Sequence, residues 1–206
     1  MKTLRIPRLQ DCADLDTALE TGGGVFHVEC VNWPSEYPYA PFCAGRTGHT
    51  ADSLVVDFRV SGLDLRAMNT ADQGRSWEDS ACEIFLQVPG DTRYYNFETN
   101  PAGKIVACCG PDRYDRTPIP EEKLASIGRR AFVEAPVEHA GGVWNWRVVL
   151  TIPFDVLGVA APSRLLGNIY KCGDLTAHPH FLTWAPIDTP KPDFHRPEFF
   201  GEFILE

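Results

Sequence analysis

A short acidic stretch at residues 77–85 places a tryptophan and three carboxylates at the start of an apolar strand pattern. It reads Trp-Glu-Asp-Ser-Ala-Cys-Glu-Ile-Phe, so Trp77 is followed by Glu78, Asp79 and Glu83. A carboxylate that loses water at a sheet without gaining a hydrogen-bond partner costs free energy, whereas one that binds hydroxyl groups or a guanidinium is compensated. A sugar offers such hydroxyls, and its flat C–H face packs on an aromatic ring. The residue types therefore indicate one edge of a sugar-binding face.

A predicted β-hairpin places further polar groups beside Glu83. Alternation predicts strands at 81–88 and 93–100, joined by a Pro-Gly-Asp-Thr turn. Pairing the strand ends puts both apolar sides on one face and sets Glu83 opposite Glu98. A slip of two residues would set Glu83 opposite an asparagine instead. In every permitted register, Glu83, Asn96 and Glu98 share one polar face.

Two interpretations of this polar face remain open. Phe85 and Tyr94 lie beside the carboxylates, and Trp77 and Asp79 lie at the rim. A solvated face of a half-exposed antiparallel sheet is the plain alternative, because such sheets are common. That face would usually carry Lys, Thr and Ser rather than amides and carboxylates, which favours a binding face.

The elements that must position these residues are mostly strands. Segments with alternating apolar residues are expected at 25–31, 52–60, 63–68, 81–88, 93–100, 103–109, 131–135, 143–152, 165–171 and 199–205. We expect a short helix within 11–22, capped by Asp11 or Asp14, and one helical turn at 153–157. About ten strands with almost no helix predict an all-β fold, an antiparallel, jelly-roll-like β-sandwich, as a single domain over residues 1–206.

Residues 143–152 show the clearest alternation in the chain. The side chains that share one face are those of Trp144, Trp146, Val148, Leu150 and Ile152. We interpret them as core residues rather than as a ligand platform, because apolar runs of period two usually face the core. A Gly-Gly turn at 141–142 is expected to separate this strand from 131–135.

Charge and hydropathy restrict the partners. The chain of 206 residues has a formal net charge of −9 and no cluster of Lys and Arg, which argues against a nucleic-acid partner. Nothing approaches the length of a membrane span, and residues 1–7 lack an apolar run of signal-peptide length. We therefore expect no membrane partner and a cytoplasmic protein as the sequence stands, or a periplasmic or extracellular one if a leader has been removed.

The seven cysteines do not predict a metal site or a disulfide framework. They lie at positions 12, 30, 43, 82, 108, 109 and 172, and no pair has Cys-x-x-Cys spacing. The neighbouring Cys108 and Cys109 would point to opposite faces of a strand. We expect reduced thiols, as in a cytosol-like compartment.

Several segments in a fixed order resemble one family. They are 77–85, 94–98 with 100–103, 146–153 leading to 157–158, and 184–186 followed by 194–201. Their order and spacing resemble the family 9 carbohydrate-binding modules and their bacterial family-9-like relatives, over about residues 33–206. The resemblance implies a β-sandwich that binds a sugar ring or chain end without catalysis.

The resemblance also implies roles for individual residues. In that family two aromatic side chains clamp a sugar ring, and an acid after the first Trp binds its hydroxyls with amides and an Arg. Trp77 matches the first aromatic residue and Glu83 the acid, and Trp184 is the best match for the second aromatic. Asn96 and Glu98 fall where the polar contacts of the family's second strand lie.

Three further residues complete the predicted site. Arg66 is our choice for the basic partner, from its position in a strand. Asp79 lies at the rim, and His195 is expected to reach the same face from the Pro-rich loop 190–200. Packing of the phenylalanines in that loop would explain most of its composition without a ligand.

An enzyme is the main alternative function. Glu83 and Glu98 at cross-strand distance resemble the carboxyl separation of about 5–5.5 Å in retaining glycosidases. However, nothing that flanks them in the sequence predicts a deep cleft or sets their pKa values apart. No nucleophile-elbow, P-loop or dinucleotide motif is present. Haem binding is less favoured still, because Met68 is the only internal methionine.

Metal sites are weakly indicated. His178 and His180 form a His-x-His pair that suits chelation, with His195 as a third ligand, but a proline separates them and no carboxylate is matched to them. Some relatives hold structural calcium, to which Asp72 and nearby carboxylates would contribute, although no loop has ordered calcium spacing. We expect no other cofactor.

Overall fold

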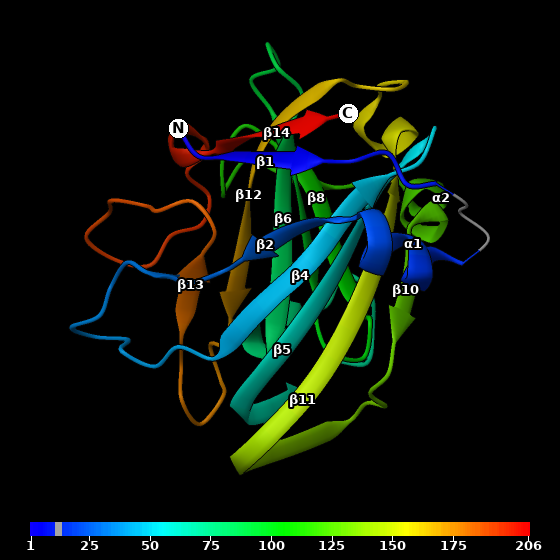
Figure 1. Ribbon diagram of the computed structural model, residues 1–206. Helices are drawn as coiled ribbons and strands as arrows, with labels where there is room; N and C mark the ends of the chain where they lie inside the picture. Colours follow the sequence, from blue (N-terminus) through cyan, green and yellow to red (C-terminus); the bar gives the residue numbers. More distant parts are fainter. Residues whose placement is uncertain (11–13) are drawn as a thin grey trace.

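Two β-sheets pack face to face in the computed structural model, which describes residues 1–10 and 14–206 (Figure 1). The larger sheet has the order β1-β14-β12-β6-β7-β8-β9, and β13 extends it by pairing with both β12 and β3. Its strands are β1 (Thr3–Ile6), β3 (Cys30–Val31), β6 (Ala81–Gln87), β7 (Tyr94–Thr99), β8 (Ile105–Gly110), β9 (Thr117–Pro118), β12 (Arg164–Cys172), β13 (Phe181–Thr183) and β14 (Gly201–Leu205). Only β1 and β14 pair in parallel among its named strands in the described residues.

The smaller sheet is antiparallel and has the order β10-β11-β5-β4-β2. Its strands are β2 (Gly24–His27), β4 (Phe42–His49), β5 (Ser53–Ala67), β10 (Gly128–Ala131) and β11 (Val137–Pro153). The helical segments are α1 (Leu15–Gly22), α2 (Glu121–Ser126) and three 3-10 turns, η1 (Ser76–Glu78), η2 (Phe154–Leu157) and η3 (Pro197–Phe199). The predicted all-β, antiparallel sandwich with short helices is confirmed.

The main core lies between the two sheets and is built by strand alternation. From β5 it receives Leu54, Val56, Phe58 and Val60, and from β11 it receives Trp146, Val148, Leu150 and Ile152. The larger sheet contributes residues such as Ile84 and Phe97, which are both at most 1 % exposed. The prediction that the alternating residues of 143–152 face the core is therefore confirmed, with Trp144 half-buried at its edge.

Some strands differ from the pattern that the sequence predicts. Residues 52–60 and 63–68 form one strand, β5, which continues through Gly62. The predicted turn at Gly141-Gly142 is wrong, because both glycines lie inside β11 where the register shifts between Ala140 and Trp144. Their φ angles of 76° and 88° allow this irregularity, since glycine adopts positive φ without steric cost.

The helix α1 begins at the predicted cap. The Asp14 side chain accepts the backbone N–H of Thr17 at 3.2 Å and the Thr17 hydroxyl at 2.7 Å. This satisfies one of the free N–H groups of the first turn. The other predicted cap, Asp11, lies outside the described residues.

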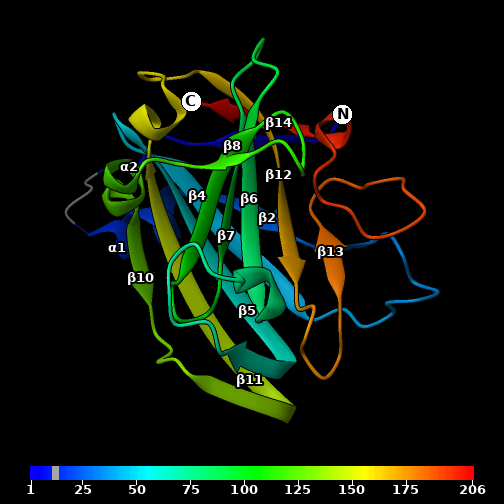
Figure 2. The ribbon, with the colours of Figure 1, turned by 180° about the vertical axis from the view of Figure 1, so that it is seen from behind.

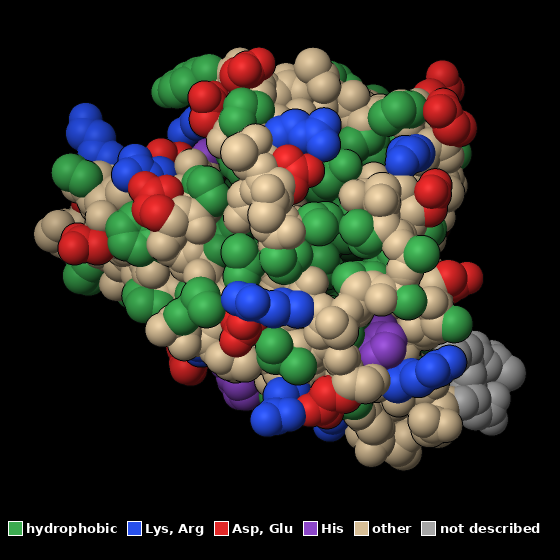
Figure 3. Space-filling view, turned by 90° about the horizontal axis from the view of Figure 1, so that it is seen from above, with side chains coloured by type: hydrophobic (Ala, Val, Ile, Leu, Met, Phe, Trp, Pro, Cys, Tyr) green, Lys and Arg blue, Asp and Glu red, His purple; other side chains and the backbone are tan. Residues whose placement is uncertain are grey.

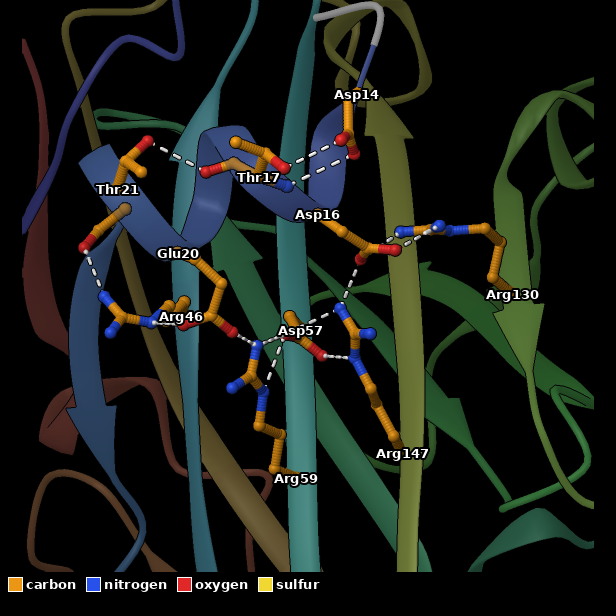
Figure 4. Close-up of polar contacts among 11 residues, drawn as sticks. Asp14, Asp16, Thr17, Glu20, Thr21, Arg46, Asp57, Arg59, Arg130 and Arg147 are labelled. Atoms are coloured by element: carbon orange, nitrogen blue, oxygen red, sulfur yellow. Dashed lines mark hydrogen bonds and ion pairs between the residues drawn. The ribbon is translucent and has the colours of Figure 1, made fainter.

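A network of ion pairs ties α1 to the outer face of the smaller sheet (Figure 4). The Asp57 carboxylate on β5 is fully buried and accepts hydrogen bonds from Arg59 and from Arg147 on β11. Arg147 also pairs with Asp16 of α1, and Arg59 pairs with Glu20 of the same helix. Guanidinium groups that each bind several carboxylates hold α1 on the sheet more firmly than isolated surface ion pairs would.

The six cysteines in the described residues are free, and Cys12 lies outside them. Cys108 is buried and Cys109 half-buried on opposite sides of β8. On the face seen from above, Lys and Arg side chains lie singly between acidic and apolar ones (Figure 3). In the part of the chain that the structure describes, no helix has the length and apolarity to cross a membrane.

Candidate functional site

The predicted β6–β7 register is confirmed. Glu83 pairs with Glu98 and Phe85 with Asn96, while Ile84 on the other side of the sheet pairs with a core residue. The two carboxylates therefore lie directly opposite each other. They are on the outer face of the larger sheet, which is in front in Figure 2.

This outer face is not a solvated one. Loops 32–41 and 184–200, on the β13 side of the sheet in Figure 2, help to cover part of it with a second apolar cluster. The members of this cluster are Trp33, Ala81, Phe85, Tyr94, Tyr170, Cys172, Ile187, Phe194 and Phe200. The rings of Tyr170 and Phe194 stack with centroids 4.3 Å apart. The plain alternative of an exposed polar face is wrong, because Glu83, Asn96 and Glu98 are each at most 3 % exposed.

A pocket of about 550 Å³ opens beside this cluster, above the two glutamates. It is lined by Tyr37, Arg75, Trp77, Glu83, Glu98, Arg113, Tyr114, Arg116, Cys172, Asp174, Phe181, Lys191, Pro192, Asp193, Phe194 and His195. These residues come from β6, β7, β12, β13, η1 and five connecting segments. The residues that flank Glu83 and Glu98 in the sequence do not indicate this pocket, because the segments that build it are far apart along the chain.

Glu83 is the more strongly perturbed acid of the floor. It is 3 % exposed, and its Oε1 accepts the Cys172 thiol at 3.1 Å. Burial, followed by repulsion from Glu98, raises its pKa well above the ordinary value. No cation contacts Glu83 among the described residues, so the neutral form is favoured more at Glu83 than at Glu98.

Glu98 has partners that stabilise its charged form. Its Oε1 accepts Asn96 Nδ2 at 2.8 Å and an Arg116 nitrogen at 3.2 Å. Burial raises the pKa of Glu98, and the adjacent Arg116 opposes that increase. Asn96 itself is fully buried and does not line the pocket. Its position makes it a support for Glu98 rather than a direct ligand contact.

Aromatic side chains form much of the wall. Trp77 is half-buried on η1, and its carbonyl accepts the backbone N–H of Asp174 at 3.3 Å. Tyr37 and Phe181 pack edge to face with centroids 4.8 Å apart. Tyr114 is 93 % exposed on the β8–β9 loop. The pocket thus presents both fixed and freely accessible rings.

His195 lies where the sequence predicts, at the pocket wall. Its Nδ1 shares a hydrogen bond of 2.7 Å with the Tyr94 hydroxyl, and its ring lies 4.9 Å from that of Phe85. Burial, followed by the charges of Arg116 and Arg113, lowers the pKa of His195 to about 3. The imidazole is neutral at physiological pH and acts as a hydrogen-bonding group.

Asp174 is a third acid in the pocket. Burial raises its pKa to about 6, and Arg113 opposes that increase. Its charge therefore changes close to neutral pH. The sequence contains no signal for this role, because Asp174 lies in an irregular loop after β12.

Besides Asn96, three other predicted site residues do not line the pocket. Asp79 is 1 % exposed and accepts the backbone N–H groups of Met68 and Asn69, each at 2.9 Å. It also accepts Asn100 Nδ2 at 2.9 Å, so it fixes the loop that leads to η1. Arg66 is held by ion pairs away from the pocket, with Asp79 at 3.5 Å and with Glu138.

Trp184 is also placed elsewhere. It is 2 % exposed in the core between the sheets, where its ring lies 5.3 Å from that of Phe203. The Lys2 ammonium lies over its ring, 5.0 Å from the ring centroid. The second-aromatic role that the resemblance implied for Trp184 does not fit this position, because a core side chain cannot reach a ligand.

The predicted metal ligands are not brought together. His178 contacts Asp64, with Nδ1 3.0 Å from Oδ2, and His180 Nε2 lies 2.8 Å from the Lys171 ammonium. Asp72 pairs with Arg129 and accepts the backbone N–H of Ile105. Within the described residues, no group of three or more His, Cys, Asp or Glu side chains has the arrangement of a metal site.

The fold and the pocket define a class: a β-sandwich with an aromatic-walled pocket on the outer face of one sheet. Comparison with protein families specifies it further. The chain belongs to carbohydrate-binding family 9, whose model matches residues 15–205. A comparison with curated proteins finds no match.

Solved structures include similar proteins. A "putative carbohydrate-binding protein" from Bacteroides uniformis ATCC 8492 is 33 % identical, with a TM-score of 0.91, and the match covers 100 % of this chain and 99 % of that one. A family 9 module from Caldicellulosiruptor kristjanssonii in complex with cellotriose is 10 % identical with a TM-score of 0.63, over 100 % and 94 % of the two chains. A structure described as a family 9 module from the same organism in complex with glucose is 11 % identical to this chain, with a TM-score of 0.62. The match covers 100 % of this chain and 96 % of that one. Both of these structures share the fold of this chain.

Proposed function

We propose that the pocket above Glu83 and Glu98 binds a sugar ring or the end of a sugar chain, without catalysis. The observation that carries this proposal is the buried acid pair at the floor of an aromatic-walled pocket, in a chain of a carbohydrate-binding family. The family 9 modules that were solved with cellotriose and glucose support it. Weak binding is expected, in the micromolar to millimolar range of about −8 to −4 kcal/mol.

The two glutamates would orient the sugar by hydrogen bonds. The protonated carboxyl of Glu83 both donates and accepts, whereas the Glu98 carboxylate, held by Arg116, only accepts. A vicinal diol, which presents donors and acceptors side by side, matches this mixed pair. Hydroxyl groups would also replace the water that these buried acids lose.

Aromatic stacking would supply the apolar contact. We assign the first stacking ring to Trp77, which lies in the pocket wall. The guanidinium carbon of Arg75 lies 5.8 Å from the centroid of this ring. We assign the second ring to Tyr114, because it is exposed and no ring contact is found for it among the described residues. The Asp112 carboxylate accepts the backbone N–H groups of Tyr114 and Asp115, at 2.7 and 2.9 Å, which orders this loop before a ligand binds.

Titration of mono- and disaccharides, followed by tryptophan fluorescence and calorimetry, tests the proposal. The Trp77→Ala and Glu83→Ala variants should bind at least about fivefold more weakly, since stacking and hydrogen bonds to the Glu83 carboxyl each contribute about 1 kcal/mol or more. Phe132→Ala and Glu122→Ala are matched controls, because both residues are exposed and neither lines the pocket. Failure of the wild type to bind any sugar would refute the proposal.

The glycosidase alternative is separated by a second measurement. A retaining hydrolase needs one protonated and one ionised carboxyl group. Release of reducing sugar from a polysaccharide, lost in Glu83→Gln, would establish hydrolysis. Sugar binding without such release supports a binding module.

A further inference from the structure

Cations gather at the mouth of the pocket although the chain is acidic overall. Four of its 19 Lys and Arg residues line this one site, namely Arg75, Arg113, Arg116 and Lys191. The Arg75 side chain is 71 % exposed, that of Arg113 is 53 % exposed, and Lys191 is also exposed. Arg116 differs, because it is 19 % exposed and pairs with Glu98.

Two of these cations lack a close acidic partner. Arg113 lies 3.8 Å from Asp193, beyond hydrogen-bonding distance, and Asp193 is at the same distance from Arg196. No side-chain hydrogen bond or ion pair is found for Lys191 among the described residues. By contrast, Arg75 pairs with Glu78 at 2.7 Å. Arg113 and Lys191 therefore have donors free for a ligand.

The charges of the pocket differ in depth, because two glutamates are buried, Asp174 and Asp193 are half-buried, and three of the four cations are exposed. Glu83 and Glu98, each 3 % exposed, form the floor, while the two free cations reach the pocket from the β8–β9 loop and from the segment before η3. The Arg113–Asp193 contact brings these two loops together at the mouth. A ligand with hydroxyl groups at one end and an anionic group at the other would complement both the floor and the mouth.

We propose that this pocket selects a sugar that bears an acidic group, with the ring hydroxyls on Glu83 and Glu98 and the acidic group at Arg113 and Lys191. This inference rests on the proposed function and adds the charge of the ligand. Guanidinium and ammonium groups bind carboxylate and phosphate oxygens through charge-assisted hydrogen bonds. The chain's net charge of −9 would repel an anion at long range. The cations must therefore act locally, within the Debye length of about 8 Å at physiological salt.

Pairs of ligands that differ only in charge test the inference by calorimetry. Glucuronate is compared with glucuronamide and glucose, and galacturonate with galactose, at low salt and at about 1 M salt. Glucose 6-phosphate shows whether a phosphate serves better than a carboxylate. Acetate and inorganic phosphate report the acidic group without the sugar ring. We expect an acidic sugar to bind at least fivefold more tightly than its neutral counterpart, and the difference to vanish at high salt.

Variants locate the effect. Arg113→Gln and Lys191→Gln should each weaken binding of the acidic sugar by about two- to fivefold and change neutral-sugar binding by less than twofold. Arg8→Gln, which is exposed and outside the pocket, should change neither. A neutral sugar that binds as tightly as its acidic counterpart would overturn this inference and leave the proposed function intact. If no sugar of either kind binds, both fail. Equal binding of acetate or phosphate alone would also overturn it, since the ring would then contribute nothing.

Discussion

Glu83 and Glu98 lie opposite each other on neighbouring strands, with both carboxyl groups buried at the floor of the pocket. Like charges in this position destabilise a sheet. Burial and repulsion from Glu98 raise the pKa of Glu83 well above its ordinary value, which favours its protonated form. The fold thus maintains an arrangement that is unfavourable without a ligand, as is common at functional sites.

This relationship predicts how stability depends on pH. Between the unfolded pKa of Glu83 and its raised folded pKa, the native state binds more protons than the unfolded state, so stability falls as pH rises. Glu83→Gln removes that loss, which amounts to about 1.4 kcal/mol per unit of pKa difference. In urea unfolding, the variant should be more stable than the wild type at pH 8 and no more stable at pH 4. Glu98→Gln is the matched comparison, and it should gain less because it leaves Arg116 unpaired. A Glu83→Gln protein less stable than the wild type at pH 8 would contradict the assignment.

The hairpin and its register could be predicted from the sequence because they depend on local information. Alternation and the Pro-Gly-Asp-Thr turn together place Glu83 opposite Glu98. Asp79 was assigned to the correct part of the chain but the wrong role, since the loop folds its carboxylate onto the N–H groups of residues 68 and 69.

The pocket itself could not be predicted in this way. Tyr37, Tyr114 and Asp174 lie in irregular loops, where no periodicity reports which face a side chain occupies. Trp184 shows the complementary error. Trp184 directly follows β13. Because β13 pairs with both β3 and β12, the Trp184 ring lies in the core beside Phe203.

Tyr114 provides a test that separates binding from stability. Its ring is 93 % exposed, so Tyr114→Ala should change the free energy of unfolding by less than about 0.5 kcal/mol. If the ring stacks on a bound sugar, the same variant should bind about two- to tenfold more weakly. Calorimetric titration and thermal unfolding on one preparation measure both quantities. Tyr114→Phe should retain binding, and a Tyr114→Ala protein with wild-type affinity would assign the second ring elsewhere.

Asp174 predicts a pH response of binding near neutrality. Its pKa of about 6 means that it is largely ionised at pH 7.5 and largely protonated at pH 5. Because the charged form repels an anionic ligand, affinity for an acidic sugar should increase as pH falls across this range. His195, with its pKa lowered to about 3, remains neutral throughout. Titrations of glucuronate at several pH values should show a flatter profile in Asp174→Asn. An unchanged profile in that variant would assign the response to another group, such as Glu83.

Asp57 predicts a large stability effect at the opposite side of the molecule. Asp57→Asn would leave Arg59 and Arg147 without their buried partner. The loss should be about 2–3 kcal/mol, below the 3–5 kcal/mol of fully buried pairs, because the Arg59 side chain is 38 % exposed. Glu20→Gln, which breaks the two more exposed pairs with Arg46 and Arg59, should cost about 1 kcal/mol or less. Urea unfolding measures both, and equal losses would show that the network does not depend on its buried member.

Trp184 distinguishes a core residue from a ligand contact. Trp184→Ala should cost about 3–5 kcal/mol of stability, because it leaves a cavity beside Phe203. Such a loss would lower binding indirectly, so the informative variant is Trp184→Phe, which keeps much of the apolar volume. We expect it to fold with a smaller loss and to bind sugar with wild-type affinity, because its ring does not line the pocket. Trp77→Phe should show the opposite behaviour, with stability retained and affinity reduced. If Trp184→Phe folds normally and binds more weakly, Trp184 contributes to the site after all, and the second ring is not Tyr114 alone.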